Sequence, residues 1–130
     1  MDWKIELVPI PVTDVDRAKD FYVNKIGFHA DYDERPNEGL RFVQLTPPGS
    51  ACSIYLGEGL TDMAPGSQHG VQIVVGSAQG AYDELQSRGV EVRGVEDLGW
   101  GKFVFFSDPD GNQWSLQELP PRPPDEGTES

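Results

Sequence analysis

The sequence is poor in several features that define whole classes of protein. Its 130 residues include one cysteine, Cys52, which excludes an intramolecular disulfide and is typical of the reducing cytosol. No apolar run approaches the roughly 18 residues of a membrane span. The N-terminal stretch also lacks the basic end and long apolar core of a signal peptide. The sequence therefore predicts a cytoplasmic protein.

Positive charge is also scarce. The chain has 10 Lys and Arg residues against 22 Asp and Glu residues, which gives a formal net charge of −12. A surface this acidic repels polyphosphates and anionic lipids, so we expect neither nucleic acid nor a membrane as a partner. Residues 120–130 are acidic and rich in proline and lack the apolar side chains of a core. They predict a flexible tail after a folded domain over residues 3–119.

The chain contains a repeat at an offset of 63 residues, in which "LVPIPVTDVDRAKDFYVNKIGF" (7–28) aligns with "GVQIVVGSAQGAYDELQSRGVEV" (70–92). In each copy apolar residues first alternate and then recur at spacings of three and four. A capping residue, Asp14 or Ser77, separates the two patterns, which predicts a strand followed by a helix. Gly27 and Gly89 stand where these helices should end.

Three short runs with the composition of β-strands follow each predicted helix. They are residues 28–34, 40–46 and 51–56 in the first copy, and residues 90–93, 102–106 and 113–118 in the second. The chain therefore reads βαβββ twice, as module 1 over about 3–57 and module 2 over about 69–119. Each half is too small to be stable alone, so the sequence predicts one α+β domain.

Three stretches resemble the vicinal-oxygen-chelate superfamily, which includes glyoxalase I, bleomycin-resistance proteins and extradiol dioxygenases. They are residues 8–28, residues 71–92 and "FVFFSDPDGNQWSLQE" (103–118). The resemblance implies that two βαβββ modules form a cupped mixed sheet around a pocket, and that the chain forms a homodimer. It says little about a reaction, because members of the superfamily isomerise, open epoxides, cleave rings, epimerise or only sequester drugs.

The resemblance also implies four positions for metal ligands, which in the superfamily are His, Gln or Glu side chains. Here these positions hold Leu7, Tyr55, Gly70 and Ser115. None of them supplies the imidazoles and carboxylates that hold a transition metal in such a site. We therefore expect no metal and no other cofactor.

A shift of one residue would bring Glu6 and His69 to two of these positions. The same shift would turn Val8 and Ile73 away from the core, and a half-buried sheet strongly resists that change. We therefore expect Glu6 and His69 at the surface.

Alternation along the strands predicts which side chains face the cup. Apolar and aromatic residues dominate this set, which is typical of a pocket for a small organic molecule. Trp100 lies in the glycine-flanked loop "LGWGK" (98–102), where its ring could close over a ligand. The predicted ligand-binding residues are Leu7, Pro9, Tyr55, Gln72, Trp100, Phe103, Phe105, Ser115 and Gln117.

The residues and the resemblance together favour a metal-independent protein that binds an apolar or planar small molecule. A metal-independent enzyme of isomerase or lyase type is an alternative, with Tyr55 or Glu118 as its acid or base, although alternation along the last strand turns Glu118 away from the cup. The substituted ligand positions disfavour a metal-dependent lyase or dioxygenase, and nothing selects a regulator without a small ligand. The identity of the ligand, and whether it is turned over, stay open at this point.

Overall fold

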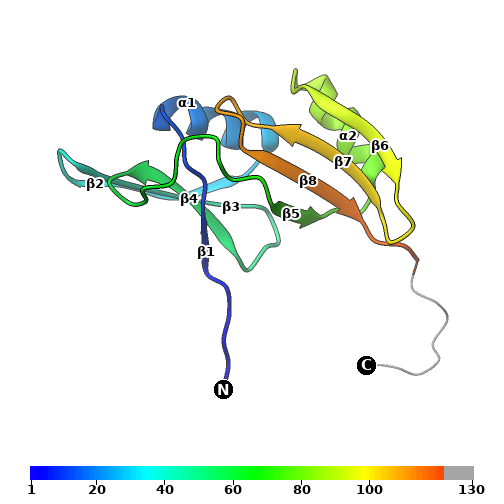
Figure 1. The fold of residues 1–130 in the computed structure, drawn as a ribbon, viewed down its shortest axis with the longest axis horizontal. Coiled ribbons are helices and arrows are strands. Elements are labelled where there is room, and N and C mark those ends of the chain that lie inside the picture. The colour runs from blue at the N-terminus through cyan, green and yellow to red at the C-terminus, as the bar shows by residue number, and fades with distance from the viewer. Residues whose placement is uncertain (122–130) are drawn as a thin grey trace.

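The structure, a computed structural model, describes residues 1–121 and consists of two modules of the same design (Figure 1). Each module has a strand, a helical segment and three further strands, which confirms the predicted βαβββ repeat. The tail predicted over 120–130 lies, from residue 122 on, outside the described residues. Module 1 contains β1 (Leu7–Pro9), α1 (Val15–Asp20), η1 (Phe21–Ile26), β2 (His29–Asn37), β3 (Leu40–Thr46) and β4 (Ser53–Glu58). Module 2 contains β5 (Val71–Val74), α2 (Ala78–Ser87), β6 (Val92–Asp97), β7 (Lys102–Ser107) and β8 (Gln113–Glu118).

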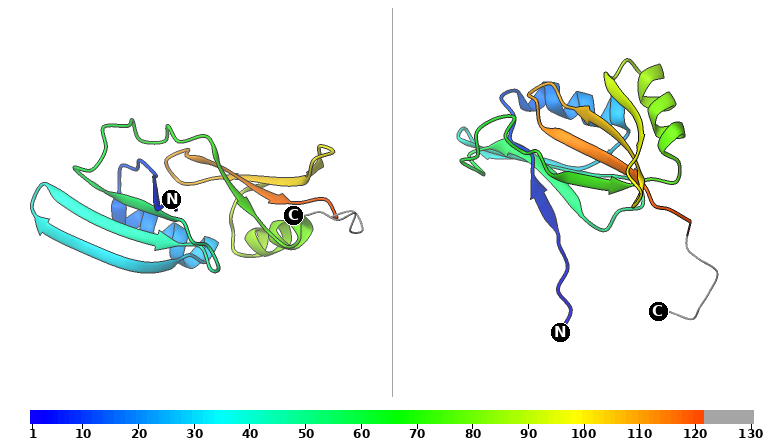
Figure 2. Two further views of the ribbon diagram at one scale, coloured as in Figure 1. Left: turned by 90° about the horizontal axis from the view of Figure 1, so that it is seen from below. Right: turned by 45° about the vertical axis from the view of Figure 1, so that its right-hand side comes forward.

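Each module forms its own four-stranded mixed sheet. The strand order is β1-β4-β3-β2 in the first sheet and β5-β8-β7-β6 in the second. The first strand of each module is parallel to the last one, and the other pairings are antiparallel. Figure 2 shows the two sheets side by side along the long axis of the molecule. Within one chain, the eight strands thus form two mixed sheets of four strands each, one in each module.

Capping residues set both helix starts, as the sequence predicts. The side chains of Asp14 and Ser77 accept hydrogen bonds from backbone N–H groups in the first turns of α1 and α2. Gly27 and Gly89 follow the two helical segments with positive φ angles of 98° and 81°. Over residues 1–121, every helix is too short or too polar to cross a membrane.

The helical segment of module 1 differs from the prediction in its second half. After α1 the chain continues as η1, a wider π-helical turn. There the N–H groups of Gly27 and Phe28 both donate to the carbonyl oxygen of Tyr22, at 2.9 and 2.8 Å. The wider turn lies where the side chain of Tyr22 reaches across to module 2, and such a long-range contact leaves no mark on local periodicity.

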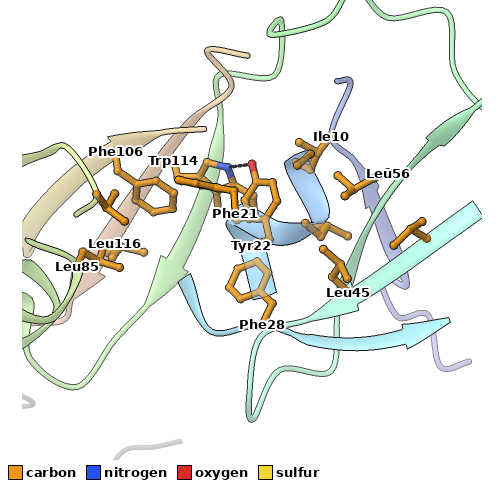
Figure 3. Close-up of a cluster of buried hydrophobic side chains, with 14 of the residues drawn as sticks. Ile10, Phe21, Tyr22, Phe28, Leu45, Leu56, Leu85, Phe106, Trp114 and Leu116 are labelled. Atoms are coloured by element: carbon orange, nitrogen blue, oxygen red, sulfur yellow. Dashed lines mark hydrogen bonds between the residues drawn. The ribbon is translucent and has the colours of Figure 1, made fainter. Parts of the chain in front are cut away.

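The helix-facing sides of both sheets share one hydrophobic core (Figure 3). In this core Phe21 lies 6.2 Å from Phe106 between ring centroids, and Tyr22 lies 5.5 Å from Trp114. Strand positions predicted to face the helices, Val8 and Ile73 among them, pack against this cluster. The opposite face of each sheet therefore lies outside the shared core.

A buried hydrogen-bond network ties the turn between β7 and β8 to module 1. The Tyr22 hydroxyl donates to Oδ2 of Asp108 at 2.7 Å and accepts from Nε1 of Trp114 at 2.8 Å, the bond drawn in Figure 3. Nδ2 of Asn112 donates to the same carboxylate oxygen and to the carbonyl oxygen of Pro11, both at 2.8 Å. Burial, followed by the charge of Asp108, raises the pKa of Tyr22 far above its usual range, so this hydroxyl keeps its proton at neutral pH.

Candidate ligand-binding site

Each sheet has one face that points away from the helices, and these two open faces hold the candidate ligand-binding residues. The structure places three of the nine predicted residues on the first face and six on the second. The first open face comprises Leu7, Pro9, Phe42, Gln44, Thr46, Ser53 and Tyr55. The second open face comprises Gln72, Phe103, Phe105, Ser115 and Gln117, with Trp100 in the turn before β7.

A short chain of amide and hydroxyl groups crosses the second open face. Nε2 of Gln72 donates to Oε1 of Gln117 at 2.7 Å, and Oγ of Ser115 donates to Oε1 of Gln72 at 3.1 Å. The strand register explains these contacts, because Gln72 lies opposite Ser115 on the neighbouring strand. The face thus offers hydrogen-bonding groups without a net charge.

Three aromatic rings form a row beside these polar groups. Phe103 and Phe105 stack with 6.1 Å between centroids, and Trp100 meets Phe103 edge-on at 6.3 Å. Only 4% of Phe103 is exposed, against 66% of Trp100. The ring of Trp100 is therefore open to solvent, whereas the ring of Phe103 is covered within one chain.

The turn that carries Trp100 is closed by hydrogen bonds. Nε2 of Gln117 donates to the carbonyl oxygen of Trp100 at 3.0 Å, and the N–H of Leu98 donates to the carbonyl oxygen of Gly101 at 3.0 Å. Gly99 adopts a φ of 92°, which favours glycine. A Cβ on Gly101 would lie 2.5 Å from Nε2 of Gln117, so this close approach also requires glycine. The predicted opening of the loop stays a prediction.

A cleft of about 440 Å³ borders the second open face at its Phe105 end, and sequence reasoning missed it. Its volume lies within the range of about 300–1,000 Å³ found for small-molecule sites. The guanidinium of Arg93 lies 4.5 Å from the ring centroid of Phe105, and its Nε lies 3.9 Å from a carboxylate oxygen of Glu96, so a paired cation covers this ring. The cleft is lined by Glu91, Val92, Arg93, Phe105, Phe106, Ser107, Asp108, Gln113 and Trp114.

The first open face combines an aromatic pair with a polar cluster. The rings of Phe42 and Tyr55 lie 6.1 Å apart. The hydroxyl oxygens of Thr46 and Ser53 are 2.6 Å apart, and Thr46 donates to the carboxylate of Asp31. Alternation along β3 could have found Phe42 and Thr46, because Val43 and Leu45 are core positions and their neighbours must face the other way. Asp31 had no such signal, since a register irregularity interrupts β2 beside it.

The two open faces are separate within one chain. Over residues 1–121, no hydrogen bond or aromatic contact joins the two sets of residues, and the sheets that carry them lie side by side (Figure 2). The structure therefore brings Leu7, Pro9 and Tyr55 together on one face. It gathers the other six predicted residues on the other.

The positions of the metal ligands implied by the superfamily do not fit a metal here. Leu7, Tyr55, Gly70 and Ser115 offer neither imidazole nor carboxylate. In the described part of the chain, no three His, Cys, Asp or Glu side chains are placed to hold one ion. We therefore derive no chemistry through a metal.

The strand register also decides against a one-residue shift. Val8 and Ile73 pack against the core, as expected. Glu6 is exposed, and its carbonyl oxygen accepts a hydrogen bond from the N–H of Ser53 at 2.9 Å. His69 is also exposed, with Nε2 at 2.9 Å from the carbonyl oxygen of Gly66. Both residues thus lie at the surface, as the alternation predicts.

Paired βαβββ modules with one shared core define the glyoxalase class of fold. The family model described as Glyoxalase/Bleomycin resistance protein/Dioxygenase superfamily matches residues 4–116, and the chain belongs to this superfamily.

Several solved structures resemble the chain over nearly its whole length. TnmS3, an antibiotic-binding protein from Streptomyces sp. CB03234, is 35% identical with a TM-score of 0.84, and the match covers 92% of this chain and 98% of TnmS3. A member of the same superfamily from Sphaerobacter thermophilus DSM 20745 is 34% identical with a TM-score of 0.81, covering 90% and 98% of the two chains. Among curated proteins, YetH of Bacillus subtilis (strain 168) is 29% identical over 88% of this chain and 98% of its own.

Proposed function

We propose that the protein is a metal-independent binder of an apolar, planar small molecule. The observation that carries this proposal is the row of Trp100, Phe103 and Phe105 beside uncharged hydrogen-bonding groups. Flat aromatic walls favour flat ligands, because offset stacking adds about 0.5–1.5 kcal/mol per ring pair beyond the burial of area. The similarity to an antibiotic-binding protein supports the same reading.

The ionisable groups of the chain support binding better than they support catalysis. The groups with shifted pKa values are Tyr22, Asp33 and Arg41, and each shift has a structural cause away from the open faces. Hydrogen bonds from Arg41 and Lys19 lower the pKa of Asp33, and the hydrogen bond with Asp33 raises that of Arg41. Over residues 1–121, these shifts point to no acid–base pair beside the aromatic row.

We further propose that the protein is a homodimer in the cytoplasm. Apolar side chains of both open faces, such as Leu7, Tyr55 and Phe105, keep exposed surface within one chain. A second copy could set the first open face of one chain opposite the second open face of the other, and so close a pocket that one chain leaves open. The free thiol of Cys52 agrees with a reducing compartment.

Isothermal titration calorimetry with two planar polycyclic probes, proflavine as a cation and pyrenesulfonate as an anion, tests the binding proposal. We expect at least one probe to bind, and Trp100→Ala to weaken it about tenfold or more. The melting temperature should change little, since Trp100 is mostly exposed. Leu98→Ala, in the same turn, is the matched control and should bind as the wild type does. Equal binding by Trp100→Ala and the wild type would contradict the assigned site.

A further inference from the structure

A line of polar side chains crosses the first open face and ends on a carboxylate. Asp31 lies at a register irregularity of β2, and irregularities of this kind re-aim a side chain. Its Oδ1 lies 3.8 Å from Nε2 of His29, and its Oδ2 accepts a hydrogen bond from the hydroxyl of Thr46. The hydroxyl oxygens of Thr46 and Ser53 are 2.6 Å apart, and Nε2 of Gln44 lies 3.4 Å from Oγ of Ser53. Side chains from β2, β3 and β4 thus form one hydrogen-bonded chain.

The supply of hydroxyl protons fixes the direction of this chain. A carboxylate accepts hydrogen bonds and does not donate them, so the single hydroxyl proton of Thr46 points at Asp31. Thr46 then offers Ser53 only a lone pair, so the hydroxyl of Ser53 donates to Thr46. Ser53 in turn offers Gln44 only a lone pair, so the amide of Gln44 turns its N–H group toward Ser53. The carboxylate of Asp31 therefore decides which end of this amide faces Ser53.

The amide oxygen of Gln44 is the free end of the chain. Over residues 1–121, Oε1 of Gln44 accepts no hydrogen bond from the protein, and it is not a buried atom, so it is open to solvent. Gln44 lies opposite Tyr55 in the register of β3 and β4, and the ring of Tyr55 pairs with that of Phe42. A hydrogen-bond acceptor of fixed orientation therefore lies beside the aromatic pair of the first open face.

The amide oxygens of the second open face are already in use. Oε1 of Gln72 accepts from Ser115, and Oε1 of Gln117 accepts from Gln72. A ligand between the two faces therefore meets its free amide acceptor on the side of Gln44.

We propose that the ligand is a planar molecule with an N–H or O–H group on its edge, and that this group donates to Oε1 of Gln44. Asp31 is a positioning residue, which holds this oxygen outward through Thr46 and Ser53. In the proposed homodimer, Gln44 of one copy would face a ligand on the second open face of the other. Such a site disfavours a ligand of similar shape without the donor, because the acceptor would lose its water and gain no partner. This inference rests on the binding function proposed above.

Calorimetry with a matched pair of planar dyes tests the need for a donor. Proflavine and acridine orange share an acridinium ring and its positive charge, but acridine orange has dimethylamino groups where proflavine has amino groups with N–H donors. Acridine orange is the more apolar dye, so apolar contact alone would favour it. We expect the wild-type protein to bind proflavine about tenfold more tightly, which is the effect of about one hydrogen bond. Equal binding of the two dyes, or tighter binding of acridine orange, would overturn the proposal.

Substitutions along the chain test how this preference arises. Gln44→Met keeps the length of the side chain and removes the acceptor, so the preference for proflavine should disappear. Asp31→Asn supplies an amide donor to Thr46, which allows the chain to reverse and to turn Nε2 of Gln44 outward, so the preference should also disappear. Thr46→Val interrupts the chain and replaces Asp31→Asn if that variant does not fold. An unchanged preference in Gln44→Met, or in the chain variant measured, would overturn the proposal.

Glu34→Gln is the matched control for the loss of charge. Glu34 lies on the same strand as Asp31 and opposite Phe42, so it removes one carboxylate from the same face without touching the chain. The preference for proflavine should stay about tenfold in this variant. Its loss there would show that charge alone sets the preference, and would overturn the role of Asp31.

An NMR measurement without ligand tests the orientation of the amide itself. In the wild type we expect a nuclear Overhauser effect between the side-chain amide protons of Gln44 and the β-protons of Ser53. It should be lost in the chain variant and kept in Glu34→Gln, and its absence from the wild type would overturn the proposal. Binding of pyrenesulfonate without binding of proflavine would overturn this inference and leave the binding function standing. Absence of binding by both probes would overturn both.

Discussion

Tyr22→Phe removes one oxygen atom from the network that joins the two modules. Nε1 of Trp114 then loses its acceptor, and an unsatisfied buried donor costs about 1–3 kcal/mol. The carboxylate of Asp108 loses one hydrogen-bond donor. It keeps three others, namely Nδ2 and the N–H of Asn112 and the N–H of Asp110, so the lost bond to Asp108 adds only about 1 kcal/mol to the destabilisation. We expect a total loss of about 3 kcal/mol in the free energy of unfolding, which lowers Tm by roughly 10 °C.

Thermal and urea unfolding at one fixed protein concentration measure this loss, because a dimer makes Tm depend on concentration. Tyr82→Phe is the matched control: its hydroxyl accepts a bond from Gln86 at the exposed surface of α2, and we expect a change below about 0.5 kcal/mol. Equal stability of Tyr22→Phe and the wild type would refute the view that this network joins the modules.

Two further predictions concern single contacts. Gly101→Ala should lower the free energy of unfolding by about 1–3 kcal/mol, because the added Cβ displaces the side chain of Gln117. Differential scanning calorimetry measures this loss, and a variant as stable as the wild type would contradict the prediction. Asp33→Asn should lower stability by about 1 kcal/mol at pH 7, an amount reduced by the partial exposure of its ion pairs with Lys19 and Arg41. The pKa of Asp33 is lowered in the folded state, so its contribution is complete above the unfolded value of about 4 and is lost as pH falls through the folded one. Urea titrations from pH 7 to pH 3 should show the difference shrinking below about pH 4, and a constant difference would contradict the assignment.

The repeat and the strand alternation of this chain could be predicted because they are local signals. Gly27 and Gly89 mark the ends of equivalent helical segments, and each occupies the left-handed conformation expected of it. Val8 and Ile73 occupy equivalent places in the shared core. Side chains alternate along a strand whatever lies on either side of it, so the two faces of each sheet follow from the sequence.

Features that depend on contacts between modules could not be predicted in the same way. The π-helical turn at Tyr22 coincides with a hydrogen bond to Asp108, which lies 86 residues further along the chain. The burial of Phe103 follows from the approach of Trp100 and Phe105, whereas its alternation predicts only the face on which it lies. The separation of the two open faces likewise follows from the packing of Phe21 and Tyr22 against module 2.

At the four positions where the superfamily resemblance implies metal ligands, the side chains of module 1 are larger than those of module 2. Leu7 and Gly70 are equivalent by the offset of 63, and Tyr55 and Ser115 are equivalent because they lie opposite Pro9 and Gln72, which share that offset. Module 1 thus carries a large apolar pair and module 2 a small one, and a Cβ on Gly70 would meet no atom within 4 Å. In the proposed homodimer, the first open face of one copy, with the large side chains of Leu7 and Tyr55, would lie opposite the second open face of the other copy, with the small residues Gly70 and Ser115. If the proposed function and homodimer hold, we expect a flat ligand to lie over Gly70 and Ser115 on the second open face, with Tyr55 of the other copy against it.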